Sequence, residues 1–520
     1  MNLIKQNLLI IISLIPFILS AQKKEIVGYF PQWGIEHQPY YVKHIETAGS
    51  ADKITVLNYA FAIPGYDSLG NIVVKFMNSS YDYQQTYTAD MSIDGIADDS
   101  TQSLRGHFNQ LRKLKARHPH LRIVISIGGW LGSIYFSDAA LTEASRESFV
   151  NSCIDIFIKG NLPVENRAGG IGAAAGIFDG IDIDWEYPLS DGVEGIRHNE
   201  NDNDNLSKLY ALFRSKLAKI NPNLLLTAAV PATESGLKKY NITEDQKYLN
   251  WYLLMTYDFC GGWDPLTGHH ANLLSSNESK DSFDNSIKLL LNKYLVSKEK
   301  IIPGAAFYGK NWKVKNPQNN GLYQQGVIAP GIYEAGFNYY RDMIPLLKKG
   351  YKYFWDTAAA APYLFNETDS IFYTLDDAQS IALKAHYVDA FGLRGLMFWE
   401  ISGDDSNGTL VNTIYTRNMP NIKITKQDSL AVNSSIEVTN PPPNDFFYAG
   451  LNILVNTKAG ASIVKVEFLG DDKSLGYDTT PPFNWVWFNV EEGQHKIDAI
   501  ATDDRGRTIT SKQIIIKVHK

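Results

Sequence analysis

The sequence predicts an α/β protein built on a TIM (β/α)8 barrel, with a small α+β domain inserted late in the barrel and a separate all-β domain at the C-terminus. Two observations support this prediction. Eight short apolar runs alternate with segments of 3.6-residue periodicity through the first four hundred residues, and eight is the number of strands that closes such a barrel. Short runs with a two-residue period then follow a polar, proline-containing stretch. An open, doubly wound sheet is the alternative, and the strand count favours the barrel.

The barrel strands are predicted from runs that are apolar, short and bounded by turn residues. The helices are predicted from the intervening segments, such as SLRGHFNQLRKLKARHP and AQSIALKAHYVDAFG, in which apolar residues recur every three to four positions. A chain of 520 residues is long enough for this barrel and one or two further domains. The predicted strands cover residues 25–30, 53–62, 122–129, 178–187, 224–231, 251–258, 301–309 and 393–400.

The later part of the chain departs from this alternation. The stretch at about residues 313–376 is too long for one helix and is rich in aromatic residues, so we expect an α+β insertion within a barrel domain of residues 22–418. Residues 419–443 are polar and end in three consecutive prolines, which predicts a linker. Residues 444–520 then show short alternating strands, the pattern of a β-sandwich.

The first residues have the order of a secretory signal peptide. Lys5 precedes an apolar run over residues 8–19, and the small residues Ser20 and Ala21 follow, so we expect cleavage close to Ala21. A transmembrane anchor is the competing interpretation, but the run holds about 12 residues where roughly 20 are needed. We therefore expect residues 1–21 to direct export, to the medium or to a periplasm, with no membrane association after cleavage.

The composition disfavours two classes of partner. The formal net charge is −7 and the isoelectric point is near 5.9, whereas nucleic acids and anionic membranes favour basic surfaces. A neutral partner fits better. Hydrophobic content of 44% and charged content of 20% are those of an ordinary globular protein.

The cysteines and acidic runs predict neither a disulfide framework nor a cofactor. Cys153 and Cys260 are the only cysteines, so two buried free thiols are the first expectation and a single bridge stays open. Neither has a His, Asp or Glu at the spacing of a zinc site. The acidic run at residues 198–205 lacks the glycine and closing glutamate of an EF-hand, and the glycine-rich residues 169–176 precede a strand. We therefore predict no metal and no nucleotide.

The stretch DGIDIDWEYP, residues 179–188, carries the acids that bear on function. Asp182, Asp184 and Glu186 share one parity, and the apolar residues between them share the other. A solvated strand face is the ordinary explanation of such alternation, but in a barrel neither face of a strand meets bulk water along its length. The acids are therefore expected to line the interior toward the C-terminal mouth. Burying carboxylates costs several kcal/mol each unless partners are found, which indicates function.

Polar and aromatic residues gather at the predicted C-terminal ends of the other strands, the face on which barrel active sites lie. Flat rings at such a mouth suit a sugar-binding cleft, because they pack on the apolar faces of pyranoses. The residues at these strand ends are Tyr29, Trp33, Ser126, Gly128, Gly129, Trp130, Met255, Tyr257, Asp258, Tyr308, Trp399 and Glu400.

These motifs resemble those of glycoside hydrolase family 18 chitinases. The family signature D-x-x-D-x-D-x-E is matched by Asp179, Asp182, Asp184 and Glu186, and S-x-G-G is matched by SIGG. The matches continue in LNYAFA, MTYD, FYGKNW and GLMFWE, so the resemblance covers roughly residues 25 to 415. The insertion resembles that of one chitinase subfamily, and the last domain resembles the immunoglobulin-like modules of secreted bacterial hydrolases.

The resemblance implies a retaining, substrate-assisted hydrolysis, in which the 2-acetamido oxygen of the substrate attacks the anomeric carbon and forms an oxazolinium ion. Glu186 is then the general acid and base, with Asp182 and Asp184 raising its pKa. Asp184 is expected to accept the acetamido N–H, and Tyr257 to donate to the acetamido oxygen. The substrate-binding residues implied are Tyr29, Trp130, Met255, Asp258, Tyr308 and Trp399, with Trp399 as the floor, and the scaffolding residues are Asp179, Ser126, Gly128 and Gly129.

The expected function is that of a secreted, monomeric chitinase that acts on chitin or chitooligosaccharides without a cofactor. An endo-β-N-acetylglucosaminidase acting on glycoprotein glycans is the first alternative, because it would use the same acids. The aromatic insertion favours a long linear substrate over it. A lectin that binds chitin without cutting it is the second alternative, and the presence of Glu186 disfavours it.

Three aromatic residues of the C-terminal module, Phe483, Trp485 and Trp487, share one strand face. Exposed, these rings would stack on a polysaccharide, whereas buried they are the core of a sandwich. We expect burial, which makes the module a spacer, and chitin binding by the module stays the alternative.

Overall fold

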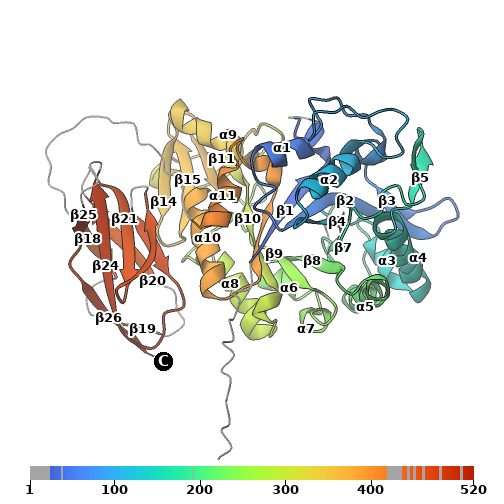
Figure 1. The fold of residues 1–520 in the computed structure, drawn as a ribbon. Coiled ribbons are helices and arrows are strands. Elements are labelled where there is room, and N and C mark those ends of the chain that lie inside the picture. Colours follow the sequence, from blue (N-terminus) through green and yellow to red (C-terminus); the bar gives the residue numbers. More distant parts are fainter. Residues whose placement is uncertain are drawn as a thin grey trace, which may run out of the picture.

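The computed structural model describes residues 24–36, 39–190, 192–417, 436–441, 446–448, 453–459, 463–479, 483–503 and 508–519. The predicted signal peptide and most of the predicted linker lie outside the described residues. Within them the chain forms a barrel, a second sheet beside its mouth and a C-terminal sandwich, which Figure 1 shows at the red end of the chain.

Eight parallel strands close a barrel, which confirms the predicted fold class. β1 pairs in parallel with both β2 and β17, so the sheet joins its own first strand. A further strand, β3 (Ile72–Phe76), pairs antiparallel with β2 outside the ring. Around the barrel the order is β1 (Glu25–Pro31), β17 (Gly395–Trp399), β10 (Ile301–Ala306), β9 (Trp251–Met255), β8 (Leu225–Pro231), β7 (Gly180–Asp184), β4 (Arg122–Gly128) and β2 (Val56–Tyr66).

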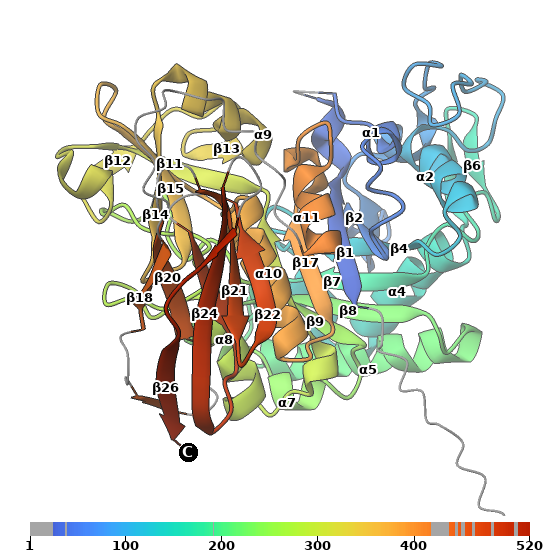
Figure 2. The same ribbon diagram turned by 60° about the vertical axis from the view of Figure 1, so that its left-hand side comes forward.

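Helices cover the outside of the barrel, as the two ribbon views show (Figures 1 and 2). Side chains cap several of them: the Thr142 hydroxyl accepts the Ser145 amide before α4, and the Asp377 carboxylate accepts the Ser380 amide before α10. The helices are α1 (Val42–Thr47), α2 (Gly106–Arg117), α3 (Phe136–Leu141), α4 (Glu143–Cys153), α5 (Asp202–Ile220), α6 (Glu234–Leu237), α7 (Ile242–Asp245), α8 (Phe283–Lys288), α10 (Ala378–Ala390) and α11 (Thr409–Thr416).

The barrel wall separates two apolar cores. Ile181, Ile183 and Trp185 belong to the core between strands and helices, where Trp185 stacks on Phe136 of α3 at 5.4 Å. A second cluster fills the barrel interior and includes inward residues of every barrel strand except β7. β7 therefore turns its even-numbered residues inward, as the alternation predicts. The interior cluster consists of Val27, Tyr29, Val56, Ala60, Phe61, Val124, Leu225, Ala229, Trp251, Leu253, Ile302 and Met397.

A second, antiparallel sheet forms from residues 308–375. The strand predicted over residues 301–309 is interrupted, because β10 ends at Ala306 and β11 begins at Tyr308. Tyr308 therefore starts the second sheet, where its backbone pairs with β13, and does not end a barrel strand, which corrects the prediction. The elements are β11 (Tyr308–Val314), β12 (Gly326–Ile328), β13 (Phe337–Tyr339), α9 (Tyr340–Met343), β14 (Lys352–Asp356), β15 (Ala361–Asn366) and β16 (Ile371–Leu375).

The C-terminal module is a pair of sheets. β18 lies inside residues 419–443, so the predicted end of the linker is wrong: Ile436 and Val438 are buried when β18 pairs antiparallel with β20. Phe483 and Trp485 are buried, and Trp487 is partly buried, as expected. One sheet holds β18 (Ile436–Asn440), β20 (Ile453–Ala459) and β23 (Asn484–Trp487), and the other holds β19 (Phe446–Tyr448), β21 (Ile463–Gly470), β22 (Lys473–Asp478), β24 (Gly493–Asp503), β25 (Thr508–Thr510) and β26 (Ile514–His519).

Both cysteines are free: Cys153 is buried and Cys260 is partly buried. The single bridge that the sequence left open is therefore not formed. Over the described ranges, no helix is long and apolar enough to cross a membrane.

Candidate active site

The inward face of β7 carries the three acids of the motif. Asp182 is fully buried, Asp184 is almost fully buried, and Glu186 lies just past the strand end and is partly exposed. Residues two apart on a strand point to the same face and lie about 7 Å apart. The three carboxylates therefore form a row that rises from the barrel interior to its C-terminal mouth.

Three hydroxyl groups from three other strands converge on Asp182. Tyr29 of β1 and Ser126 of β4 donate to Oδ2 at 2.9 and 2.8 Å, and Thr227 of β8 donates to Oδ1 at 2.5 Å. Burial raises the pKa of Asp182, and the three donors oppose that rise because they stabilise the ionised form. Asp182 is thus a satisfied group at the base of the row.

The upper two acids are less well satisfied. Burial raises the pKa of Asp184 well above its usual value, and the charges of Glu186 and Asp182 raise it further. Its Oδ1 atom has no hydrogen-bond partner among the described residues. Burial likewise raises the pKa of Glu186 to about 7, with the Tyr187 hydroxyl opposing this and the charge of Asp258 adding to it. A carboxylic acid with such a pKa keeps its proton near neutral pH and can act as an acid.

Two glycines let the end of β4 approach β7. A Cβ on Gly128, whose φ is +119°, would lie 2.0 Å from the Asp184 carbonyl oxygen, and one on Gly129, whose φ is +74°, would meet an aromatic ring at 2.5 Å. The Gly129 amide donates to the same carbonyl at 2.8 Å, and the Glu186 amide donates to the Ser133 hydroxyl at 2.8 Å. A side chain at Gly128 would displace the backbone that carries the acids, and one at Gly129 would displace the ring of Phe61, which stacks on Trp399.

An aromatic platform lies beside the acids. Trp399, the last residue of β17, is partly exposed, and its ring centroid lies 5.3 Å from Tyr29 and 5.7 Å from Phe61. Trp33 completes the cluster at 6.2 Å. Because the neighbouring rings hold Trp399 in place, its free surface is a rigid apolar floor at the mouth.

The end of β9 supplies a hydroxyl group that a ligand can use. Met255 and Tyr257 are partly exposed and pack at the upper end of the interior core. The Tyr257 hydroxyl lies 3.8 Å from the Met397 sulfur, which is a weak acceptor, and its ring meets Tyr308 at 6.0 Å. The Tyr257 hydroxyl is therefore available to donate to an oxygen atom of a ligand.

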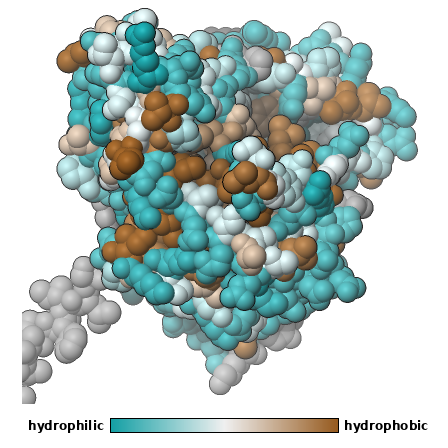
Figure 3. Space-filling model, turned by 90° about the vertical axis from the view of Figure 1, so that its right-hand side faces the viewer, coloured by the Kyte–Doolittle hydropathy of each residue, from teal (hydrophilic) through white to brown (hydrophobic). Residues whose placement is uncertain are grey.

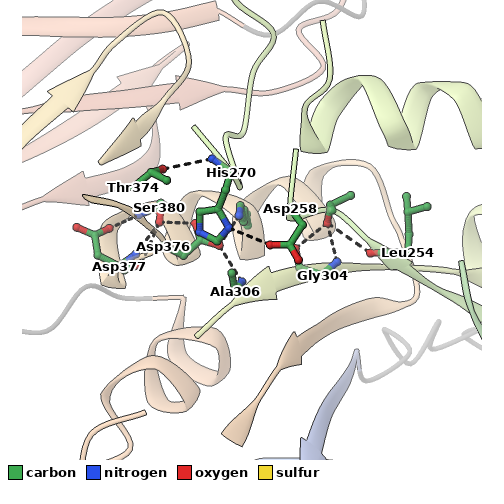
Figure 4. A network of polar contacts seen from close by, with 11 residues as sticks. Leu254, Asp258, His270, Gly304, Ala306, Thr374, Asp376, Asp377 and Ser380 are labelled. Carbon is green, nitrogen blue, oxygen red and sulfur yellow. Dashed lines mark hydrogen bonds and ion pairs between the residues drawn. The ribbon is translucent and has the colours of Figure 1, made fainter. Parts of the chain in front are cut away.

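Asp258, which follows Tyr257, is held as a fixed negative charge. The Tyr308 hydroxyl donates to it at 2.7 Å, the Lys310 ammonium lies 3.2 Å away, and Figure 4 shows His270 on another side, with Nδ1 at 3.7 Å. Burial alone would raise the pKa of Asp258, but Lys310, helped by His270 and Tyr308, outweighs it and lowers that pKa well below the usual range. Asp258 therefore acts on Glu186 through its charge and is no proton donor.

Asp179 lies at the far end of β7 from the mouth. The Lys115 ammonium of α2 binds it at 2.6 Å, and the Ile123 amide of β4 donates to it at 2.9 Å. These contacts join β7 to its neighbours and keep Asp179 out of the row of acids.

Exposed aromatic rings mark the rim. Trp130 follows β4, is 49% exposed and meets the ring of Tyr187 at 6.5 Å. Trp263 is 64% exposed, and the Lys310 ammonium lies 5.3 Å from its ring. Figure 3 shows hydrophobic side chains bordering a hollow on the face of the molecule away from the module. Such surfaces suit a ligand with apolar faces and few charges.

Four residues of the site were not singled out from the sequence: Thr227, Ser133, Lys310 and His270. Thr227 is the one polar residue of the run LLLTAAVP, and Lys310 is the one cation among the aromatic residues of FYGKNW, so the sequence contained a hint of both. Ser133 and His270 left none, because each lies on a loop and reaches the site only through the fold.

The chain was compared with known proteins. The sequence profile of Glycosyl hydrolases family 18 matches residues 25–404. The chain belongs to this family. A second profile, Bacterial Ig domain, matches residues 435–499, in agreement with β18 as the first strand of the module.

Several relatives of this family 18 chain have names that state an activity. Chitinase A1 of Niallia circulans is 33% identical over 429 residues, which is 76% of this chain and 58% of that protein. Chitinase C of Streptomyces lividans is 36% identical over 389 residues, which is 74% of this chain and also 58% of that protein. The chain thus spans a little under three fifths of the length of these relatives.

Solved structures show the same architecture. The catalytic domain of psychrophilic chitinase B from Arthrobacter TAD20 superposes with a TM-score of 0.70 at 34% identity, covering 76% of this chain and 96% of that one. Chitinase ChiA74 from Bacillus thuringiensis superposes with a TM-score of 0.65 at 25% identity and covers 96% of this chain and 85% of that one.

Proposed function

We propose that this protein is a chitinase, which hydrolyses β-1,4 bonds between N-acetylglucosamine units with retention of configuration. The observation that carries the proposal is the row of acids on β7 that ends in Glu186, whose pKa of about 7 suits a general acid at neutral pH. The two chitinases to which this chain is 33% and 36% identical support the same substrate class.

In the proposed reaction, Glu186 donates its proton to the glycosidic oxygen as the bond to the anomeric carbon breaks. The acetamido oxygen of the same sugar attacks that carbon from the other face and forms an oxazolinium ion. Glu186, now ionised, removes a proton from water, which attacks the anomeric carbon and opens the oxazolinium ring. Two inversions at one carbon restore the β-anomer.

The carboxylates around Glu186 favour a nucleophile from the substrate over one from the protein. A protein nucleophile must face the acid across the scissile bond. Asp182 accepts hydrogen bonds from three hydroxyl groups, and Asp258 forms an ion pair with Lys310, so both carboxylates are already engaged. Asp184 is the last residue of β7 and Glu186 follows it by two residues, so Asp184 stands beside the acid and not across from it.

We propose roles for the remaining groups that their positions support. Asp184, whose buried Oδ1 has no hydrogen-bond partner in the part of the chain that the structure describes, turns toward the substrate and accepts the acetamido N–H, which orients the attacking oxygen and balances the positive charge that forms on the ring. The Tyr257 hydroxyl donates to the acetamido oxygen. Trp399 is the floor under the reacting sugar, and Trp130 with Met255 extends the contacts along the substrate. Tyr308 is buried and donates to Asp258, so it positions that carboxylate and does not meet the sugar.

The decisive experiment follows the first products by NMR, with a long N-acetylglucosamine oligosaccharide as substrate. Products that appear first as the β-anomer, together with an inactive Glu186→Gln variant, support substrate-assisted chitinolysis. An initial α-anomer contradicts the mechanism. Cleavage of glycoprotein glycans in place of the oligosaccharide supports an endo-β-N-acetylglucosaminidase, and binding without cleavage supports a lectin.

Export is a second part of the proposal, and it rests on the order of charges, apolar residues and small residues in residues 1–21. Protein recovered from the medium or the periplasm of an expressing bacterium is expected to begin close to Gln22. Recovery of the intact N-terminus from the cytoplasm contradicts it.

A further inference from the structure

Helix α10 lacks the polar outer face with which barrel helices normally meet water. Ten of its 13 residues are buried. Helix α5, on another side of the barrel, exposes Asp204, Lys208 and Lys219. A helix that is buried all round needs a partner on every side, and the barrel wall covers only one of them.

The barrel side of α10 is fixed by buried polar contacts. The Lys384 ammonium lies 2.5 Å from the Asp376 carboxylate, and both side chains are fully buried. The same carboxylate accepts the Ala306 amide of β10 at 3.0 Å, as Figure 4 shows, and the Tyr387 hydroxyl donates to Asp284 of α8 at 2.8 Å. These contacts set the position of α10 on the barrel.

The other side of α10 is covered by the C-terminal module, which lies beside it in both ribbon views (Figures 1 and 2). The ring of His386 meets Trp485 of β23 edge-on at 4.8 Å. The ring of Tyr387 meets Phe488 edge-on at 4.9 Å. Trp485 is 2% exposed, so its ring is part of a closed interface.

Polar contacts continue this interface. The Gln379 side-chain amide of α10 donates to the Asp478 carboxylate at the end of β22, at 3.4 Å, and Asp478 is fully buried. The Tyr353 hydroxyl of β14 donates to Asp377 at 2.9 Å at the start of the same helix. A buried carboxylate of the module therefore has a hydrogen-bond partner on α10, which a flexibly tethered domain does not provide.

We propose that the C-terminal module is an intramolecular brace: its β22 and β23 elements, with Phe488, cover the outer side of α10, so that barrel and module unfold as one unit. Stacking on a polysaccharide does not fit Trp485, whose ring is enclosed by His386 and Phe468. The brace also reaches the site, because α10 leads directly into β17, the strand that ends in Trp399.

The test uses the full chain and three interface variants. Trp485→Ala and Phe488→Ala remove rings from the module, and His386→Ala removes one from α10 at the lowest risk to folding. The matched control is Trp487→Ala, because this ring is on the same strand and packs within the module on His495 at 5.4 Å. Calorimetry reports unfolding, and the loss of hydrolytic activity during heating reports the state of the barrel.

The full chain is expected to unfold in one transition. Phe488→Ala and Trp485→Ala are expected to speed the thermal loss of activity about tenfold, although both lie outside the barrel, whereas Trp487→Ala, which removes a partly exposed ring from the module, is expected to have a smaller effect. In the His386→Ala background the effect of Trp485→Ala becomes smaller, because the partner ring is already gone.

Two results overturn the brace. One is a separate, earlier transition for the module in the wild type, with barrel inactivation unchanged in Phe488→Ala. The other is weaker retention of Trp485→Ala on insoluble chitin with unchanged thermal unfolding, which makes this face a binding surface. Calorimetry does not depend on catalysis, so the brace is tested even if the proposed activity fails.

Discussion

Two strands of this protein bury side chains of opposite kinds, and burial has opposite consequences. β7 and the residues just after it bury carboxylates in the barrel, where the pKa values of Asp184 and Glu186 rise and one Asp184 oxygen has no partner within the described ranges. Such burial costs stability. β23 and the residue before it bury Phe483 and Trp485 in an apolar core, which contributes stability.

The difference shows which feature marks a functional site. Both strands attract attention in the sequence, one through its acids and one through its aromatic residues. Only β7 holds groups that folding alone disfavours, so only β7 needs a chemical reason. The buried rings of the module are explained by packing, and its contact with α10 gives them a structural role.

Among these changes, Glu186→Gln is expected to have the largest effect on activity. Hydrolysis falls about a thousandfold, because the amide cannot donate the proton. The folded state does not lose stability. Because the pKa of Glu186 is raised to about 7, folding favours its protonated form, so its contribution to stability falls as the pH rises from about 4.5 through 7.

The measurements for Glu186→Gln are oligosaccharide turnover and chemical denaturation at several pH values. The variant is expected to lack the part of the pH slope that Glu186 supplies. Near-normal turnover, or an unchanged slope, contradicts the assignment of the acid. Tyr187→Phe keeps the acid but removes the hydroxyl group that lowers the pKa of Glu186, so its pH slope is expected to move to higher pH and not to vanish.

Phe483→Ala tests the other strand. Removing the ring is expected to lower the free energy of unfolding by about 3–5 kcal/mol. Hydrolysis measured well below the unfolding temperature is expected to stay at the wild-type rate, because Phe483 lies in the module. Denaturation and turnover are measured on the same preparation, and Phe483→Leu, which retains most of the volume, is the milder control. A free energy of unfolding equal to that of the wild type would contradict the structural role of this ring.

Thr227→Val tests how far the hydroxyl groups offset the burial of Asp182. The valine has nearly the same shape but cannot donate to Oδ1, so the free energy of unfolding is expected to fall by about 1–3 kcal/mol near neutral pH. The pKa of Asp182 rises further, because this donor opposes the effect of burial. Thr227→Ser keeps the hydroxyl group, so its free energy of unfolding is expected to fall by less than that of Thr227→Val. Equal decreases in the two variants, measured by chemical denaturation, would refute the role of the hydrogen bond.

Asp258→Asn is expected to give the smallest effect. The charge of Asp258 helps to raise the pKa of Glu186, so its removal lowers that pKa. Glu186 then loses its proton at a lower pH, and the alkaline limb of the rate profile moves down by less than about one pH unit. The pH dependence of kcat/KM checks this, and a shift to higher pH would show that the charge acts otherwise.

Much of the fold could be predicted from local patterns. Each of the eight barrel strands overlaps its predicted range, and the parity of Asp182, Asp184 and Glu186 correctly indicates the inward face. The break between β10 and β11 was missed, because Ala306 to Tyr308 continues the apolar pattern while the hydrogen bonds pass to another sheet. The start of the module was missed because β18 is short and follows a polar stretch.

The sequence by itself determined the number of strands, the face on which the acids lie and the family signature, because periodicity and spacing are local properties of the chain. The tertiary structure alone decided which groups surround those acids. Tyr29 and Thr227 are separated from Asp182 by 153 and 45 residues, and they meet it because the barrel closes. The tertiary structure also decided that Trp485 faces α10. The contact between the two domains depends on their folded surfaces, which the periodicity of β23 and that of α10 do not reveal.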